Sequence, residues 1–186
     1  MLDAPQAPAP DVATLADLEV FDPDGDEIRL GDLWNGQRVV LVFVPQFGSA
    51  GAREHAGLVK EKLTDIRRLG AEVYLIGNGP TEALLAYETE LKPGCEVYAD
   101  SELKAYAAAG MLRKAGSNWA LKAMGQRVRS VLQGAQGDLW QLGGVLAIAP
   151  PGRAVFHKPC QTPAEAPDLE SARLALKNSG WSHLSI

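Results

Sequence analysis

The chain lacks several features that mark whole classes of protein. It has only two cysteines, Cys95 and Cys160, among 186 residues, which is too few for a secreted disulfide framework. Neither cysteine has metal-site spacing, and His157 and His183 are far apart, so we expect no metal and no cofactor. The longest apolar run, residues 39–45, is far shorter than the roughly 20 residues that cross a bilayer, so no membrane span is expected.

The beginning of the chain has no targeting pattern. The first dozen residues contain three prolines and no basic residue, whereas a secretory signal needs a cationic start and an apolar run. We therefore predict a flexible Pro/Ala-rich arm over residues 1–13, a single domain over residues 14–186, and a cytoplasmic location.

The charge balance limits the kinds of partner. Lys and Arg total 18 against 23 Asp and Glu, a net charge of −5, which argues against a non-specific nucleic-acid binder. The glycines do not follow the GxxxxGK[ST] order of a phosphate loop. Hydrophobic residues make up 46% of the chain, which is enough to bury the core of a globular domain.

Runs of apolar and β-branched residues predict the strands of an α/β fold. Residues 17–21 and 27–30 flank Pro23-Asp24-Gly25, a turn-forming sequence, and predict an N-terminal β-hairpin. Residues 38–46 are almost uninterruptedly apolar, as expected of a central strand buried on both faces. Further strands are predicted at residues 71–77, 96–99, 144–149 and 154–158, of which the last two form a buried hairpin.

Helical periodicity lies between these strands. After Gly48, apolar residues recur every three or four positions until Gly70: they are Ala52, Ala56, Val59, Leu63, Ile66 and Leu69. A second helix is predicted with Thr81 as its cap and with Leu84, Leu85 and Leu91 facing inward. A short helix is predicted at residues 101–109, and further helices at residues 117–132 and 168–178. The order predicts parallel strands with an antiparallel hairpin added to the same sheet.

The last predicted helix and the preceding one have apolar faces of their own. Residues 168–178 place Leu169, Ala172, Leu174 and Leu176 at helical spacing, and residues 117–132 do the same with Leu121, Met124, Val128, Val131 and Leu132.

Two segments resemble a known family. Residues 39–59, VVLVFVPQFGSAGAREHAGLV, resemble the redox segment of peroxiredoxin-like proteins of the alkyl hydroperoxide reductase/thiol-specific antioxidant family, where a strand runs into Phe-Gly-Cys-x-x-Cys-Arg-Glu-His. Residues 141–158, QLGGVLAIAPPGRAVFHK, resemble the family's Gly-Gly strand, turn and following strand. The resemblance covers roughly residues 15–178. It implies a thioredoxin-like fold, in which a mixed central sheet is flanked by helices, and membership of the antioxidant oxidoreductases.

The chain departs from this family at its chemistry. Ser49 and Ala52 stand where the resemblance places the two cysteines, so the redox motif is replaced by Ser49-Ala50-Gly51-Ala52. A serine hydroxyl is not ionised near neutral pH and forms neither a sulfenic acid nor a disulfide. Two origins remain open: a natural loss, or deliberate replacement of both cysteines.

The redox motif supplies the candidate site residues. The catalytic positions implied by the resemblance are Ser49, Ala52 and Arg53, and the residues expected around a ligand are Phe47, Gly48, Glu54, Gly143 and Gly144. Ser49 is interpreted first as a helix N-cap. In the family, an arginine at position 53 supports the thiolate; here Arg53 either anchors an anion at the helix N-terminus or forms an ion pair.

His55 is interpreted as a hydrogen-bonded structural residue. It lies about 240° around the helix from Ser49, so a Ser-His hydrolase is not predicted. Cys95 and Cys160 are expected at opposite edges of the sheet, too far apart for a disulfide. Cys160 follows a strand that ends on the motif's side, so it is the candidate for lone-thiol chemistry, although a passive cysteine is the favoured interpretation.

Residues 103–137 contain no acidic residue and six basic ones: Lys104, Arg113, Lys114, Lys122, Arg127 and Arg129. They form either a solvated helix face or a surface for a small anionic ligand or an acidic protein partner. Trp119 and Trp140, near the ends of the segment, either line an apolar cleft beside it or belong to the core.

Three functional hypotheses follow, and whether the chain is an enzyme stays open. The first is a thioredoxin-fold, peroxiredoxin-like protein without its active-site thiols, either a pseudoenzyme or a Cys-replaced thiol enzyme. The second is a non-redox enzyme or binding module that holds a small anionic ligand in the cleft beside Phe47, Ser49, Arg53 and Gly143. The third is an interaction protein that forms a homodimer, as is common among peroxiredoxin relatives.

Overall fold

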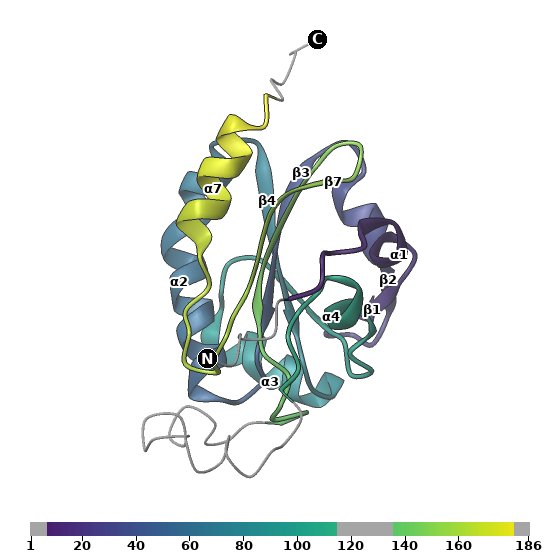
Figure 1. Ribbon diagram of the computed structural model, residues 1–186. Helices are drawn as coiled ribbons and strands as arrows, with labels where there is room; N and C mark the ends of the chain where they lie inside the picture. The colour runs from purple at the N-terminus through teal and green to yellow at the C-terminus, as the bar shows by residue number, and fades with distance from the viewer. Residues whose placement is uncertain (1–6, 115–135, 181–186) are drawn as a thin grey trace, which may run out of the picture.

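A seven-stranded mixed sheet forms the centre of the protein in its computed structural model, which describes residues 7–114 and 136–180 (Figure 1). In chain order the strands are β1 (Glu19–Phe21), β2 (Glu27–Arg29), β3 (Arg38–Val44), β4 (Ala71–Gly77), β5 (Glu96–Ala99), β6 (Gly144–Ala149) and β7 (Arg153–Pro159). Their order across the sheet is β2-β1-β5-β4-β3-β6-β7. The predicted N-terminal hairpin is the antiparallel pair β1–β2.

Strand β3 occupies the position predicted for the central strand. All seven of its residues are buried, and it pairs in parallel with β4 and antiparallel with β6. In this register Val42 lies between Leu75 of β4 and Val145 of β6. The uninterrupted apolar run therefore exists because helices cover both faces of this strand.

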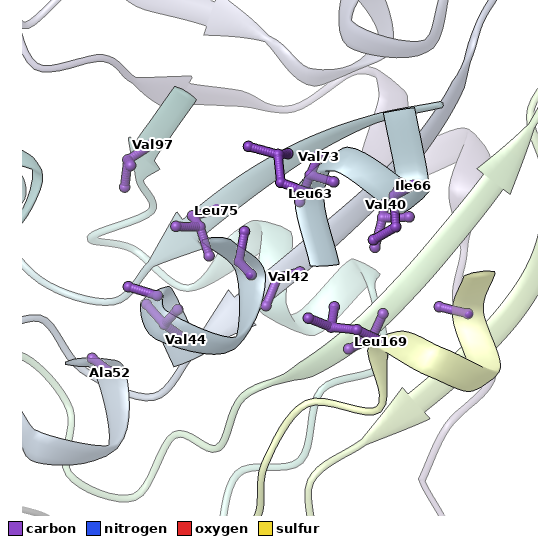
Figure 2. Packing of buried hydrophobic residues seen from close by; sticks show 14 of the residues in the cluster. Val40, Val42, Val44, Ala52, Leu63, Ile66, Val73, Leu75, Val97 and Leu169 are labelled. Atoms are coloured by element: carbon purple, nitrogen blue, oxygen red, sulfur yellow. The ribbon is translucent and has the colours of Figure 1, made fainter. Parts of the chain in front are cut away.

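Helices lie on both faces of the sheet, as Figure 1 shows. They are α1 (Val12–Ala16), the 3₁₀ helix η1 (Leu30–Trp34), α2 (Ala50–Arg67), α3 (Thr81–Leu91), α4 (Lys104–Ala108) and α7 (Leu169–Asn178). Helices α2, α3 and α7 cover the face that carries Val40, Val42 and Val44 (Figure 2). Helices α1, η1 and α4 cover the opposite face, which carries Val39, Leu41 and Phe43. Together the two layers give the predicted thioredoxin-like architecture.

Several sequence predictions about the elements need correction. Leu85 of α3, which was predicted to face inward, is 51% exposed, and Leu174, one of the apolar residues of α7, is 43% exposed. Helix α3 has Pro80 as its N-cap residue, so Thr81 is its first helical residue and not its cap. Strand β7 is an edge strand with mostly half-buried residues, not a buried one. The helix predicted over residues 117–132 lies outside the described residues.

The segment expected to be a flexible arm contains the start of a helix. Asp11 caps α1 through a hydrogen bond from Thr14 N to its carboxylate (3.0 Å), and Asp11 N donates to Ala108 O (2.8 Å). Leu15 of α1 is completely buried in the core that α4 and η1 share. In the described part of the chain, no helix is long and apolar enough to cross a membrane.

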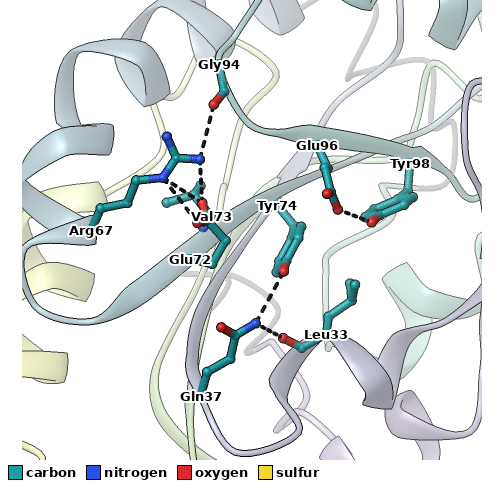
Figure 3. A network of polar contacts seen from close by, with 9 residues as sticks. All are labelled: Leu33, Gln37, Arg67, Glu72, Val73, Tyr74, Gly94, Glu96 and Tyr98. Carbon is teal, nitrogen blue, oxygen red and sulfur yellow. Dashed lines mark hydrogen bonds and ion pairs between the residues drawn. The ribbon is translucent and has the colours of Figure 1, made fainter. Parts of the chain in front are cut away.

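A polar network marks the end of the sheet where β4 and β5 begin (Figure 3). Arg67 Nε donates to Glu72 Oε1 (2.9 Å), and Arg67 also donates to Gly94 O (3.2 Å). Gln37 Nε2, just before β3, donates to Leu33 O (2.7 Å). Residues 49–52, which the resemblance aligns with the family's redox motif, lie at the opposite end of the sheet, where the parallel strands β3 and β4 finish.

Candidate functional site

Ser49 is the N-cap of α2, as predicted. Its Oγ accepts a hydrogen bond from Ala52 N (3.1 Å) and donates its proton to Gln46 O (2.8 Å). The chain reaches this position through Gly48, whose positive φ of 78° gives the sharp turn from β3 into α2. Ser49 is 0% exposed. The hydroxyl thus binds backbone groups before and after residue 49 in the chain, and it is shielded from solvent.

The two other positions of the redox motif also have structural partners. Ala52 is completely buried between the sheet and α3, and Tyr87 of α3 donates its hydroxyl proton to Ala52 O (2.7 Å). The Arg53 guanidinium forms an ion pair with Glu90 of α3, and both side chains are about half exposed. Arg53 therefore joins two helices by a surface ion pair, while its neighbour Glu54 is exposed.

Phe47, predicted as a ligand contact, packs into the core. Its ring lies 5.1 Å from that of Tyr87 and is fully buried. The ring occupies the space above Gly77, where an added Cβ atom would lie only 1.9 Å from Phe47 Cζ. A glycine at the end of β4 is thus what allows Phe47 to cover the site.

A distant segment, residues 136–141, crosses the site. Gln136 N donates to Phe47 O (2.7 Å), and Phe47 N donates to Asn78 O (3.0 Å). Asn78 Nδ2 donates to Asp138 O (2.8 Å), and Asn78 Oδ1 accepts from Asp138 N (3.1 Å). The segment is therefore attached to the chain that follows β3 and to the chain that follows β4.

Gln46 also binds this segment. Its Nε2 donates to Asp138 O (3.0 Å) and to Gln141 O (2.8 Å), while its buried Oε1 has no hydrogen-bond partner within the described part of the chain. Neither Gln46 nor Asn78 was predicted from the sequence as a site residue. The available signal was their place, one or two residues after two parallel strands, since polar residues at the carboxyl ends of such strands meet at one edge.

His55 is a buried structural residue, as interpreted from the sequence. Its Nε2 lies 3.1 Å from Glu165 O, which is an acceptor only, so this nitrogen carries the ring proton. Burial lowers the pKa of His55 to about 4. Its ring packs beside Gly143, whose added Cβ would lie 2.2 Å from Phe43 O. An added Cβ at Gly144 would lie 2.6 Å from Met111 Sδ, so both Gly143 and Gly144 are explained by close packing at the start of β6.

The two cysteines are free and far from each other in the sheet. Cys95 precedes β5 and Cys160 follows β7, and three strands lie between β5 and β7. The prediction that they lie at opposite edges of the sheet is wrong for Cys95, because the β1–β2 hairpin lies beyond β5. Burial raises the pKa of each thiol to about 12, so both are protonated near neutral pH. Cys160 Sγ contacts Glu165 O at 3.5 Å.

The described basic residues of segment 103–137 are each engaged. Lys104 pairs with Glu102, Arg113 pairs with Asp138 (2.7 Å), and Lys114 Nζ donates to Gln161 O. Lys122, Arg127, Arg129 and Trp119 lie outside the described residues, and Trp140 is half-buried. Residues 7–114 and 136–180 contain no group of three or more His, Cys, Asp and Glu residues able to hold a metal.

Comparisons with known proteins agree with this architecture. The prostamide/prostaglandin F synthase of Danio rerio is 32% identical over 166 residues, which are 82% of this chain and 80% of that protein. A chloroplastic thioredoxin-like protein of Arabidopsis thaliana is 28% identical over 153 residues, 75% of this chain and 61% of that protein.

The solved structures of two peroxiredoxins show the same fold. The peroxidoxin BcpB of Mycobacterium tuberculosis has a TM-score of 0.66 at 17% identity, covering 91% of this chain and 96% of its own. Peroxiredoxin Q of Xanthomonas campestris has a TM-score of 0.64 at 14% identity, covering 92% and 94%. The family of AhpC/TSA antioxidant enzymes matches residues 57–159, which begin after positions 49 and 52. The chain belongs to the AhpC/TSA antioxidant enzyme family.

Proposed function

We propose that this chain is a pseudoenzyme of the peroxiredoxin-like antioxidant family, with no thiol chemistry at the family's redox position. The observation that carries the proposal is Ser49. Its hydroxyl is fully buried. It donates a hydrogen bond to Gln46 O and accepts one from Ala52 N, by which it caps α2. Such a group has neither the ionisation nor the access that peroxide or disulfide chemistry requires.

The remaining thiols are poor substitutes. The pKa of Cys95 and of Cys160 is raised to about 12 by burial, so the reactive thiolate is scarce near neutral pH. The relatives named prostamide/prostaglandin F synthase are similar in sequence, but we do not propose their activity for this chain, because Ser49 and Ala52 stand where the resemblance places the family's two cysteines.

The alternative of a small anionic ligand gains little support from the described residues. Phe47 and Ser49 are completely buried, and the charge of Arg53 is shared with Glu90. A role in homodimerisation stays a separate hypothesis, which the molecular mass in solution tests.

Peroxide consumption tests the proposal directly. We expect the chain, supplied with hydrogen peroxide and dithiothreitol, to consume peroxide no faster than the protein-free mixture. The Cys160→Ser variant is the matched control, because it removes the thiol on the motif's side of the sheet. Turnover by the unmodified chain that disappears in this variant would refute the pseudoenzyme proposal.

Restoring both cysteines tests how much of the site was lost. In the double variant Ser49→Cys, Ala52→Cys, we expect the thiol at position 49 to have a pKa below the ordinary ~8.5, because it lies at the N-terminus of α2. Adding Glu90→Gln releases Arg53 from its ion pair, so we expect a further decrease in that pKa. The measurement is the pH dependence of alkylation at position 49. An unperturbed pKa and no peroxide consumption would show that the surroundings have diverged along with the two side chains.

A further inference from the structure

A half-open cavity lies at the end of the sheet where β3 begins. Its volume is about 540 Å³, and residues of α1, of the 3₁₀ helix η1 and of the turn between β6 and β7 line it. In Figure 1 this turn is the light-green loop at the top of the sheet. Ser49 follows the other end of β3, so the cavity is separate from the position that the family uses for its thiol.

Trp34, the last residue of η1, places a hydrogen-bond donor without a partner in the cavity wall. The residue is only 4% exposed, and its indole N–H makes no hydrogen bond within residues 7–114 and 136–180. Nε1 lies 3.9 Å from the position that an added Cβ atom would take at Gly152, so the N–H edge of the ring lies beside the β6–β7 turn. Buried indole N–H groups normally have an acceptor. This one therefore indicates an acceptor from outside the chain.

The rest of the lining combines a second donor with apolar rings. Asn35 is exposed, and its amide also has no hydrogen-bond partner in the described parts of the chain. Gly36 leaves the approach to this side open, because an added Cβ there would meet no atom within 4 Å. Pro150 and Pro151 supply the apolar part of the lining. The cavity thus offers two free donors next to two proline rings.

The charges around the cavity are unbalanced toward negative. Arg29 lines it, but Arg29 Nη2 donates to Asp17 Oδ1, and Arg29 Nη1 lies 3.9 Å from Asp32 Oδ1. Two carboxylates beside one guanidinium leave an excess negative charge at this corner of the molecule. The local field therefore favours a cationic group in the cavity over an anionic one.

We propose that this cavity binds an extended, proline-rich peptide segment of another protein that also carries lysine or arginine. A polyproline II segment has no internal hydrogen bonds, so its carbonyl groups are free to accept from Trp34 and Asn35. Its rings pack on Pro150 and Pro151, and its basic side chain lies near Asp32. A small ligand is less suitable, because a half-open cavity does not enclose most of such a ligand's surface.

Both walls of the cavity are held in place without a ligand. Gln37 Nε2 donates to Leu33 O (2.7 Å) at the end of η1, as Figure 3 shows, and Leu33 is buried in the core. On the other side, Gly152 N donates to Ala149 O (3.0 Å) and closes the β6–β7 turn. A preformed site has little to order when it binds, which lowers the cost of binding.

The indole signal of Trp34 in a ¹H–¹⁵N NMR spectrum reports binding at the donor itself. Its absence from the spectrum of Trp34→Phe assigns it. We expect the signal to move when the acetylated peptide Ala-Pro-Pro-Arg-Pro-Pro-Lys is added, and the movement gives the Kd. Asn35→Ala is expected to raise this Kd roughly two- to tenfold, the effect of one lost hydrogen bond. Asp32→Asn is expected to raise it about two- to fivefold, by an amount that shrinks as salt is added.

Glu61→Gln is the matched control. It makes the same change of charge as Asp32→Asn at an exposed residue of α2, on the other face of the sheet, and we expect it to leave the Kd unchanged. The peptide with alanine in place of each proline is expected to bind at least tenfold more weakly. Urea unfolding confirms that Asn35→Ala and Asp32→Asn stay folded.

Three results would overturn the proposal. The first is a Trp34 signal that no concentration of the peptide moves, and the second is equal binding of the alanine peptide. The third is a Trp34 signal that moves with protein concentration alone, which would make a second copy of this chain the occupant. Because the experiment involves neither peroxide nor a thiol, its outcome is independent of the pseudoenzyme test.

Discussion

His55 illustrates how a residue of the segment that resembles the family's redox motif belongs to the buried interior. Its side chain is almost completely buried, Nε2 binds Glu165 O, and Nδ1 has no partner among the described residues. The neutral ring therefore fits this environment better than the charged ring does. Sequence alone suggested a structural histidine here, but it gave no indication of Glu165, which is 110 residues away.

The pH dependence of stability follows from this burial. The pKa of His55 is about 4 in the folded protein against an ordinary 6.5, so the unfolded chain binds the extra proton between these values. The stability contributed by the neutral ring is complete above pH 6.5 and decreases as the pH falls toward 4, by about 1.4 kcal/mol per pH unit. The His55→Gln variant keeps a donor for Glu165 O. Between pH 7 and pH 5, we expect its free energy of unfolding to fall by about 2 kcal/mol less than that of the parent protein.

Urea unfolding at the two pH values measures the difference. Carboxylates titrate in both chains, so the comparison isolates His55. His157→Gln is the control: burial lowers the pKa of His157 as well, but that residue is only half-buried, and we expect a smaller change. If the stability of the parent and that of His55→Gln depend equally on pH, the lowered pKa of His55 is contradicted.

At the scale of elements, local pattern was enough for α2 and β3. The recurring apolar residues of α2 all lie on the sheet, from Ala52 to Ile66, and Ser49 caps the helix. The pattern failed where a helix is only partly covered, because Leu85 and Leu174 fit the same periodicity and yet face solvent. Periodicity identifies an apolar stripe, but the width of the stripe that neighbours cover depends on tertiary packing.

The amide contacts of Gln46 and Asn78 were beyond a local pattern for another reason. Their partner, Asp138, is 92 and 60 residues away in sequence, on a segment that had no strand or helix signal. The positions at the ends of β3 and β4 indicated where polar residues would gather, but not which distant backbone they would bind.

Two glycines in neighbouring elements give opposite predictions. Gly57 lies within α2 with open space around its Cα. Gly57→Ala is therefore expected to stabilise the protein by about 0.5–1 kcal/mol, because alanine has less conformational freedom than glycine in the unfolded state.

Gly77 ends β4 beneath the Phe47 ring. Gly77→Ala is expected to destabilise the protein by about 1–3 kcal/mol or more, since three ring atoms lie 1.9–2.5 Å from the new Cβ. Urea denaturation measures both. A neutral Gly77→Ala would mean that Phe47 does not fill the space above β4.

At the scale of the whole molecule, strand identities were predicted better than the sheet order. Residues 38–46, 71–77 and 144–149 were each predicted to form a strand, but the β1–β2 hairpin was not placed beyond β5. The only residue pair joining β1 to β5 is Phe21 with Ala99. A ladder of one residue pair between short strands leaves almost no trace in the hydrophobic pattern of either strand.

The structure places the start of the folded domain a few residues earlier than the sequence predicted. The sequence favoured a flexible arm through residue 13, whereas Asp11 caps α1 and donates its backbone N–H to Ala108 O (2.8 Å). A chain that starts at Pro8 keeps both contacts, so we expect its stability to match that of the full chain. A chain that starts at Thr14 loses the cap and the backbone bond, and we expect its free energy of unfolding to fall by roughly 1–3 kcal/mol.

Thermal and urea unfolding of the two shortened chains measure this difference. Leu15→Ala in the full chain serves as a reference, because emptying a completely buried leucine site is expected to cost about 2–5 kcal/mol. If the two shortened chains are equally stable while Leu15→Ala is strongly destabilised, α1 is held by its apolar packing alone and the boundary after residue 13 is the correct one.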